Sequence, residues 1–162
     1  MDLWEIYFVS AYDAETSIKL ISAAVIGSVI GLERVLAGKD PGLRTFMLVC
    51  LGSCLFSIVS QSLGPDQGAD PARIAAQIVP GIGFLGAGAI FRAKDRIAGL
   101  TTAALMWLTA SIGMSIGFGN IGIGITALLI TMIFMYALEL THKLIKKIKP
   151  EAYRNRPDLN GL

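Results

Sequence analysis

The chain has 162 residues, of which 54% are hydrophobic and only 16% are charged, and its mean hydropathy is +0.64. Soluble globular domains carry about 25% charged residues, so the composition argues against a soluble protein and favours a membrane protein. The net charge of +2 says little about partners, and we expect no nucleic acid among them.

Five stretches of the chain are apolar enough to cross a bilayer, for which roughly 17–25 mostly apolar residues are needed. They cover residues 18–32, 46–63, 75–91, 101–118 and 121–140. The first and third are short and need their polar ends to reach full depth. The pattern predicts an all-α polytopic bundle of about five transmembrane helices over 18–140. An interfacial segment over 1–17 precedes it, and a basic tail over 141–162 follows.

Basic residues alternate between the connections and predict the orientation of the bundle. The connections after the first and third spans hold three Lys or Arg each, and the tail holds six. The connection after the second span holds only Arg73, the one after the fourth holds none, and residues 1–17 carry four acids and no base. Basic residues near span ends remain cytoplasmic. We therefore expect an external N-terminus, five spans and a cytoplasmic C-terminus.

Two glycine pairs have the spacing typical of close helix packing in membranes. Gly27 and Gly31 lie four apart in the first span, and Gly113 and Gly117 do so in the fourth. In lipid, helices associate through close backbone approach rather than hydrophobic burial. The pairs predict either packing within one chain or a contact between subunits, and we expect a homodimer.

The third span is unusual because it combines Pro80 with four glycines, the last at Gly88. The string from Gly81 to Gly86 fits Gly-x-Gly-x-x-Gly, but a dinucleotide site needs a preceding strand and an acid about 20 residues on, and both are missing. Pro80 removes a backbone donor, which predicts a Gly/Pro-broken third helix. Such helices mark substrate sites in transporters. The alternative is tight packing in the bundle centre, where Gly83 and Gly86 would exclude larger side chains.

The charges after the first span form a second candidate site. The first span is short, so Glu33 and Arg34 lie at or slightly within the cytoplasmic boundary, where ionisable groups suggest function. Adjacent helix residues do not face each other, so we expect Glu33 to pair with Arg44. The alternative is ordinary interfacial exposure of both side chains. Glu33 is the candidate ligand for Mg²⁺, although one carboxylate is weak support for such a site. We expect no other cofactor.

Three segments of the chain resemble the signatures of the MgtC/SapB membrane proteins. The first comprises Gly31-Leu32-Glu33-Arg34 and Gly42-Leu43-Arg44-Thr45. The second comprises Arg73-Ile74-Ala75-Ala76-Gln77-Ile78 and Gly81-Ile82-Gly83-Phe84-Leu85-Gly86-Ala87-Gly88. The third comprises Gly99-Leu100-Thr101-Thr102-Ala103-Ala104 with Trp107. The resemblance covers about 18–140 and implies these functional residues: Glu33, Arg34, Arg44, Thr45, Gln77, Gly81, Gly83, Gly86, Gly88, Thr101, Thr102 and Trp107.

The resemblance also implies a location and a function. It implies a protein of the bacterial inner membrane, and because the sequence stops at Leu162 it is similar to the short SapB-like members without a C-terminal soluble domain. Pro80 departs from the family pattern, in which a small residue other than proline is usual. The implied function is non-enzymatic regulation of membrane or ion homeostasis under magnesium limitation or stress, through contacts with other membrane proteins. The alternative is a magnesium or proton pathway that uses Glu33, Gln77 and the third span.

Overall fold

The computed structural model describes the backbone of residues 3–63, 70–93 and 96–148 and is almost entirely helical there. Its five α-helices are α1 (Leu3–Leu36), α2 (Leu43–Ser62), α3 (Ile78–Ala89), α4 (Leu100–Gly117) and α5 (Ile121–Ile148). Each predicted span corresponds to one of them. By length and composition α2, α4 and residues Ile121–Ile145 of α5 are able to cross a membrane. The predicted all-α membrane bundle is confirmed.

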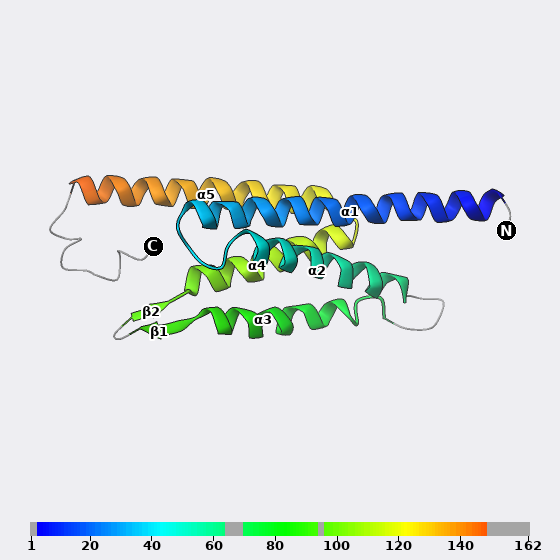
Figure 1. Ribbon diagram of the computed structural model, residues 1–162, viewed down its shortest axis with the longest axis horizontal. Helices are drawn as coiled ribbons and strands as arrows, with labels where there is room; N and C mark the ends of the chain where they lie inside the picture. The colour runs from blue at the N-terminus through cyan, green and yellow to red at the C-terminus, as the bar shows by residue number, and fades with distance from the viewer. Residues whose placement is uncertain (1–2, 64–69, 94–95, 149–162) are drawn as a thin grey trace.

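The centre of the bundle consists of α2 and α4. Helix α2 packs against α1 and α4, while α4 also contacts α3, α5 and α1. Figure 1 shows α1 and α5 along one side, α2 and α4 in the middle, and α3 along the opposite side. The α1–α2 connection, the β1–β2 hairpin and the end of α5 lie at the same end of the bundle (Figure 1). These segments belong to the basic connections and tail, so the charge pattern agrees with the alternation of the helices.

Both glycine pairs pack against α2 of the same chain. A methyl group placed on Gly27 would lie 2.7 Å from the Cys50 Cβ atom, and one on Gly31 would lie 3.0 Å from the Leu43 carbonyl oxygen. On the other side of α2, a methyl group on Gly113 would overlap the Cys50 carbonyl group, and one on Gly117 would lie 2.6 Å from the Cys54 carbonyl oxygen. The intramolecular interpretation is therefore correct for both pairs, and neither is available as the subunit contact considered from the sequence.

Helix α3 begins differently from the other helices. A short 3₁₀ turn over Ala75–Gln77 leads directly into it, and Pro80 occupies the third position of the α-helix. Proline is tolerated there because the first N–H groups of a helix have no intrahelical partner. The interruption of the third span therefore lies at its start, and Gly81 to Gly88 form continuous helix. At 1.5 Å per residue the α-helical part is about 18 Å long, shorter than the apolar core of a bilayer.

A two-stranded hairpin that the sequence did not suggest joins α3 to α4. Strand β1 (Phe91–Ala93) pairs antiparallel with β2 (Arg96–Ala98), with Phe91 opposite Ala98. Gly99 then starts α4 with a φ of 88°, in the left-handed region that glycine adopts readily. A methyl group there would overlap the Ala89 carbonyl group. This glycine lets the chain turn directly from the hairpin into α4.

The two ends of the bundle do not coincide with the predicted segment boundaries. Helix α1 starts at Leu3, so residues 3–17 continue the helix that contains the first predicted span. Helix α5 continues to Ile148, so the first part of the predicted basic tail is helical. The remaining tail, 149–162, lies outside the described residues.

Candidate functional site

The first motif contains an ion pair between sequence neighbours. The Arg34 Nε atom donates to Glu33 Oε2 at 2.5 Å, and Arg34 Nη2 donates to Glu33 Oε1 at 2.6 Å. Arg34 is only 5% exposed, and the Glu33 side chain is 25% exposed. The predicted pairing of Glu33 with Arg44 is wrong, because the long arginine side chain folds back along the helix surface and reaches its neighbour. Glu33 is thus already neutralised by a bidentate partner.

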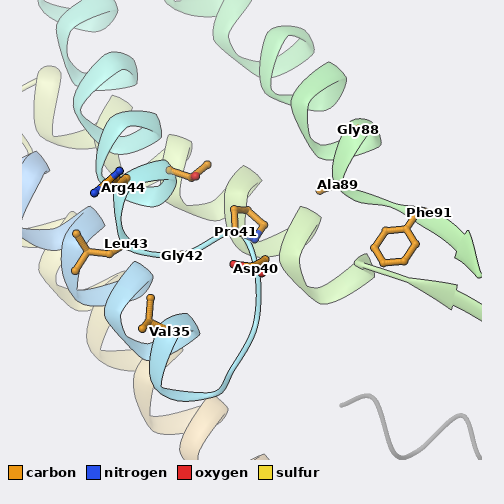
Figure 2. A pocket seen from close by; sticks show the side chains of 10 residues that line it. Val35, Asp40, Pro41, Gly42, Leu43, Arg44, Gly88, Ala89 and Phe91 are labelled. Carbon is orange, nitrogen blue, oxygen red and sulfur yellow. The ribbon is translucent and has the colours of Figure 1, made fainter.

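Arg44 and Thr45 instead line a cleft of about 690 Å³ at the end of the bundle. One wall of the cleft consists of the α1–α2 connection and the start of α2. The other wall consists of the end of α3 and the start of β1. Figure 2 shows Asp40, Pro41 and Arg44 on one side and Gly88, Ala89 and Phe91 across from them. Among the described residues, neither the Arg44 guanidinium nor the Thr45 hydroxyl has a polar partner.

A second hollow, of about 580 Å³, runs between α2 and α3. It exists because α3 packs along α4 and scarcely contacts α2. Gln77 and Gly81 line it from α3 and the turn before it, and Thr45 lines it from α2. Thr45 therefore belongs to both hollows. Five of the predicted residues line one or both of these hollows, namely Arg44, Thr45, Gln77, Gly81 and Gly88.

The remaining glycines of the third span face in two directions. Gly86 is buried, and a methyl group on it would lie 3.6 Å from the Ala103 Cβ atom, an ordinary van der Waals distance. Gly83 is exposed, and a methyl group on it would have no neighbouring atom within 4 Å. The expectation of close packing at Gly83 is therefore wrong, and Gly86 makes a contact that is not unusually tight. The outer face of α3 is open instead, with Phe84 82% exposed.

The third motif lies on α4, and neither hollow includes it. Thr102 is buried, while Thr101 and Trp107 are exposed on the helix surface. The Trp107 carbonyl oxygen accepts a hydrogen bond from the Ser111 hydroxyl at 3.1 Å. The structure assigns these residues no shared site with Glu33 or with the cleft.

Ser60 holds the start of the third span in place, a role that the sequence reasoning missed. Its hydroxyl donates to the Pro71 carbonyl oxygen at 2.6 Å and accepts from the Ala75 N–H at 3.2 Å. The side chain is almost completely buried. It ties the segment before α3 to the end of α2. A serine near the end of an apolar span was the only available signal, and its partners come after the end of α2 in the sequence.

The described residues do not form a multidentate metal site. No group of three or more His, Cys, Asp or Glu side chains in that part of the chain is arranged to hold a metal ion. Glu33, the candidate ligand, has both carboxylate oxygens in contact with Arg34. A guanidinium in this position opposes a second cation, so the geometry does not favour Glu33 as a magnesium ligand.

The comparison with known sequences decides the family. The MgtC family profile matches residues 20–144 of the 162. The chain belongs to the MgtC family. The profile match includes all three motifs and α2 to α4 in full, so the resemblance inferred from the motifs is confirmed.

Individual relatives of this MgtC-family chain cover most of it. It is 46% identical over 146 residues to "Putative magnesium transporter YhiD" of Escherichia coli K12, and the aligned region covers 86% of the chain and 66% of the relative. It is 43% identical over 115 residues to "Protein MgtC" of Salmonella typhimurium LT2, and the aligned region covers 71% of the chain and 48% of the relative. The chain thus spans about half to two thirds of these relatives. No solved structure matches it.

Proposed function

We propose that this MgtC-family chain is a non-enzymatic regulator of ion homeostasis in the bacterial inner membrane, active under magnesium limitation. Support for the link to magnesium comes from the name of the Escherichia coli relative, a magnesium transporter by that name. Support for action through protein contacts comes from the outer face of α3. One observation carries the proposal: a motif that resembles the family signature lies on a helix face that the chain itself leaves uncovered.

That face is formed by Gly83, Phe84 and Ala87, all of them exposed. The two small residues allow another backbone to approach closely, and Phe84 supplies a large apolar side chain next to them. Small residues of this kind are typical of helix interfaces in membranes. Since both glycine pairs pack against α2 inside the chain, this face of α3 is the better candidate for a homodimer contact. A closed two-fold pair is the commonest form of self-association.

A growth assay tests the proposal. The native chain and variants are expressed at equal membrane levels in a strain that lacks the gene, and growth is measured at low magnesium. We expect Phe84→Ala and Gly83→Leu to lose function, because they alter the outer face without disturbing contacts inside the bundle. The matched control is Phe134→Ala on α5, a phenylalanine that is 63% exposed. Full function of both α3 variants would contradict the proposal.

The second candidate function is a magnesium or proton pathway. The name of the Escherichia coli relative favours it, and so does the hollow between α2 and α3, which Thr45 and Gln77 line. The pairing of Glu33 with Arg34 opposes it, because the pathway loses its main carboxylate. Purified protein in liposomes separates the two functions. Magnesium or proton flux that Glu33→Gln abolishes would favour the pathway, and absence of flux in a protein that supports growth would favour the regulator.

A further inference from the structure

The cleft and the second hollow, a groove between α2 and α3, together form an amphipathic site. The cleft, at the end of the bundle, has charged residues on its wall, and the groove lies between the apolar surfaces of α2 and α3. Thr45 lines both of them, so the two hollows adjoin at this residue. A ligand that fills both must carry a charged group at one end and a hydrocarbon part at the other.

Among the described residues that line the cleft, Arg44 is the cation and Asp40 is the anion, and they form no ion pair with each other. Arg44 is exposed at the first turn of α2, and Asp40 lies in the connection just before it. Gly42, at the N-cap of α2, provides no side-chain cap, and the first turn holds no acid. The free N–H groups of a helix N-terminus and an unpaired arginine together suit a phosphate. The Asp40 carboxylate suits an ammonium group.

The groove is mostly apolar. Its lining includes Leu48, Phe56 and Leu85, each about half exposed, and Gly52, whose missing side chain leaves open space. Its volume of about 580 Å³ lies in the range typical of sites for small ligands, so a hydrocarbon chain fits it.

We propose that this site binds one zwitterionic phospholipid with a phosphate and a primary ammonium group, of the phosphatidylethanolamine type. The phosphate contacts Arg44 and the N-terminal N–H groups of α2, the ammonium contacts Asp40, and an acyl chain lies between α2 and α3. This inference concerns a different surface from the outer face of α3 and does not depend on the proposed function.

Native mass spectrometry of the purified protein in detergent tests the proposal. The probes are phosphatidylethanolamine, phosphatidylglycerol and phosphatidylcholine with identical acyl chains, and soluble phosphoethanolamine. We expect phosphatidylethanolamine to bind most tightly and Arg44→Gln to weaken it about tenfold, as the loss of one charge-assisted contact implies. Asp40→Asn should remove the preference over phosphatidylglycerol without weakening phosphatidylglycerol itself. Gly52→Leu should weaken all three lipids by filling the groove.

Matched controls separate the site from general lipid binding. Arg73→Gln removes an exposed arginine close to the start of the third span, and Gly122→Leu adds the same bulk on α5, where nothing lies within 4 Å. Both should bind as the native chain does. If Gly52→Leu fails to elute as a folded protein, Gly81→Leu fills the groove from its other wall.

Four results would overturn the proposal. The first is equal binding of the three lipids to the native chain, and the second is unchanged binding by Arg44→Gln and by the groove-filling variant. The third is phosphoethanolamine binding as tightly as the whole lipid, because the acyl chain in the groove would then add nothing to the affinity. If the groove-filling variant alters only self-association, a second copy of the chain occupies the groove, and the lipid assignment is wrong.

Discussion

Replacement of Gly113 by alanine tests whether α2 is clamped between its neighbours. The added methyl group would overlap the Cys50 carbonyl group and lie 3.1 Å from the Cys50 Cα atom. Helix α2 cannot retreat, because on its other side Gly27 of α1 already lies against the Cys50 side chain. Helix α4 must therefore move away, and its contacts with α2 loosen along their length.

The magnitude follows from two opposing terms. Overpacking of a well-packed contact costs about 1–3 kcal/mol, and the better helix propensity of alanine returns up to about 1 kcal/mol. With the full return, the net loss in the free energy of unfolding reaches about 2 kcal/mol, which corresponds to a drop of up to roughly 8 °C in the midpoint of thermal unfolding for a chain of this size. Thermal denaturation in detergent, followed by the fraction that still elutes as folded protein, measures this shift.

Gly122→Ala is the matched control, because Gly122 lies on α5 with nothing within 4 Å of the added methyl group. It should leave the midpoint unchanged or raise it slightly through helix propensity. Gly113→Leu should be more severe than Gly113→Ala. If Gly113→Ala and Gly122→Ala unfold at the same temperature, the close approach of α4 to α2 does not contribute to stability, and the reasoning fails.

Three further predictions concern the ion pair, the start of the third span and the orientation. Arg34→Gln should lower the free energy of unfolding in detergent by about 1–3 kcal/mol, because it leaves the Glu33 carboxylate partly buried without a partner. Adding Glu33→Gln should recover part of this loss. If the losses of the two single variants simply add in the double variant, the residues do not interact. Ser60→Ala should speed amide hydrogen exchange over 72–77, whereas Ser62→Ala should not, because the Ser62 hydroxyl donates to the Val59 carbonyl oxygen at 2.9 Å within its own helix. Equal exchange in the two variants would exclude the role of Ser60. A reporter fused to the C-terminus should be active in the cytoplasm, and activity confined to the periplasm would refute the charge-based orientation.

The sequence predicted the helices and their glycine contacts because both signals are local. Apolar runs of membrane length identify spans whatever their neighbours are, and glycines four apart lie on one face of a helix. The partner of each pair was not predictable, because Gly27 and Gly113 carry the same signal and yet lie on opposite sides of α2. Their placement depends on the packing of the whole bundle.

The candidate site was predicted less well, for two physical reasons. The expectation for Glu33 used only the directions of neighbouring side chains, whereas the length of Arg34 allows it to bend back to the carboxylate. The expectation for Gly83 assumed that all faces of the third span are covered, whereas α3 contacts mainly α4. The cleft joins Asp40 to Phe91, which are distant in sequence, so no local pattern indicated it.

The position of α2 between two glycine-bearing helices also bears on how the protein is built as it is synthesised. Helices α1 and α2 are consecutive and can pack as soon as both have been made, and α3 and α4 are joined by the short β1–β2 hairpin. The contact of α4 with α2 joins segments that are separated by the whole of α3, so it can form only after α4 has been made. We therefore expect α1 to α4 to assemble as two helical pairs that meet along α2. Gly113 and Gly117 lie at that contact, so we expect a bulky residue there to leave two formed pairs that fail to join rather than an unfolded chain.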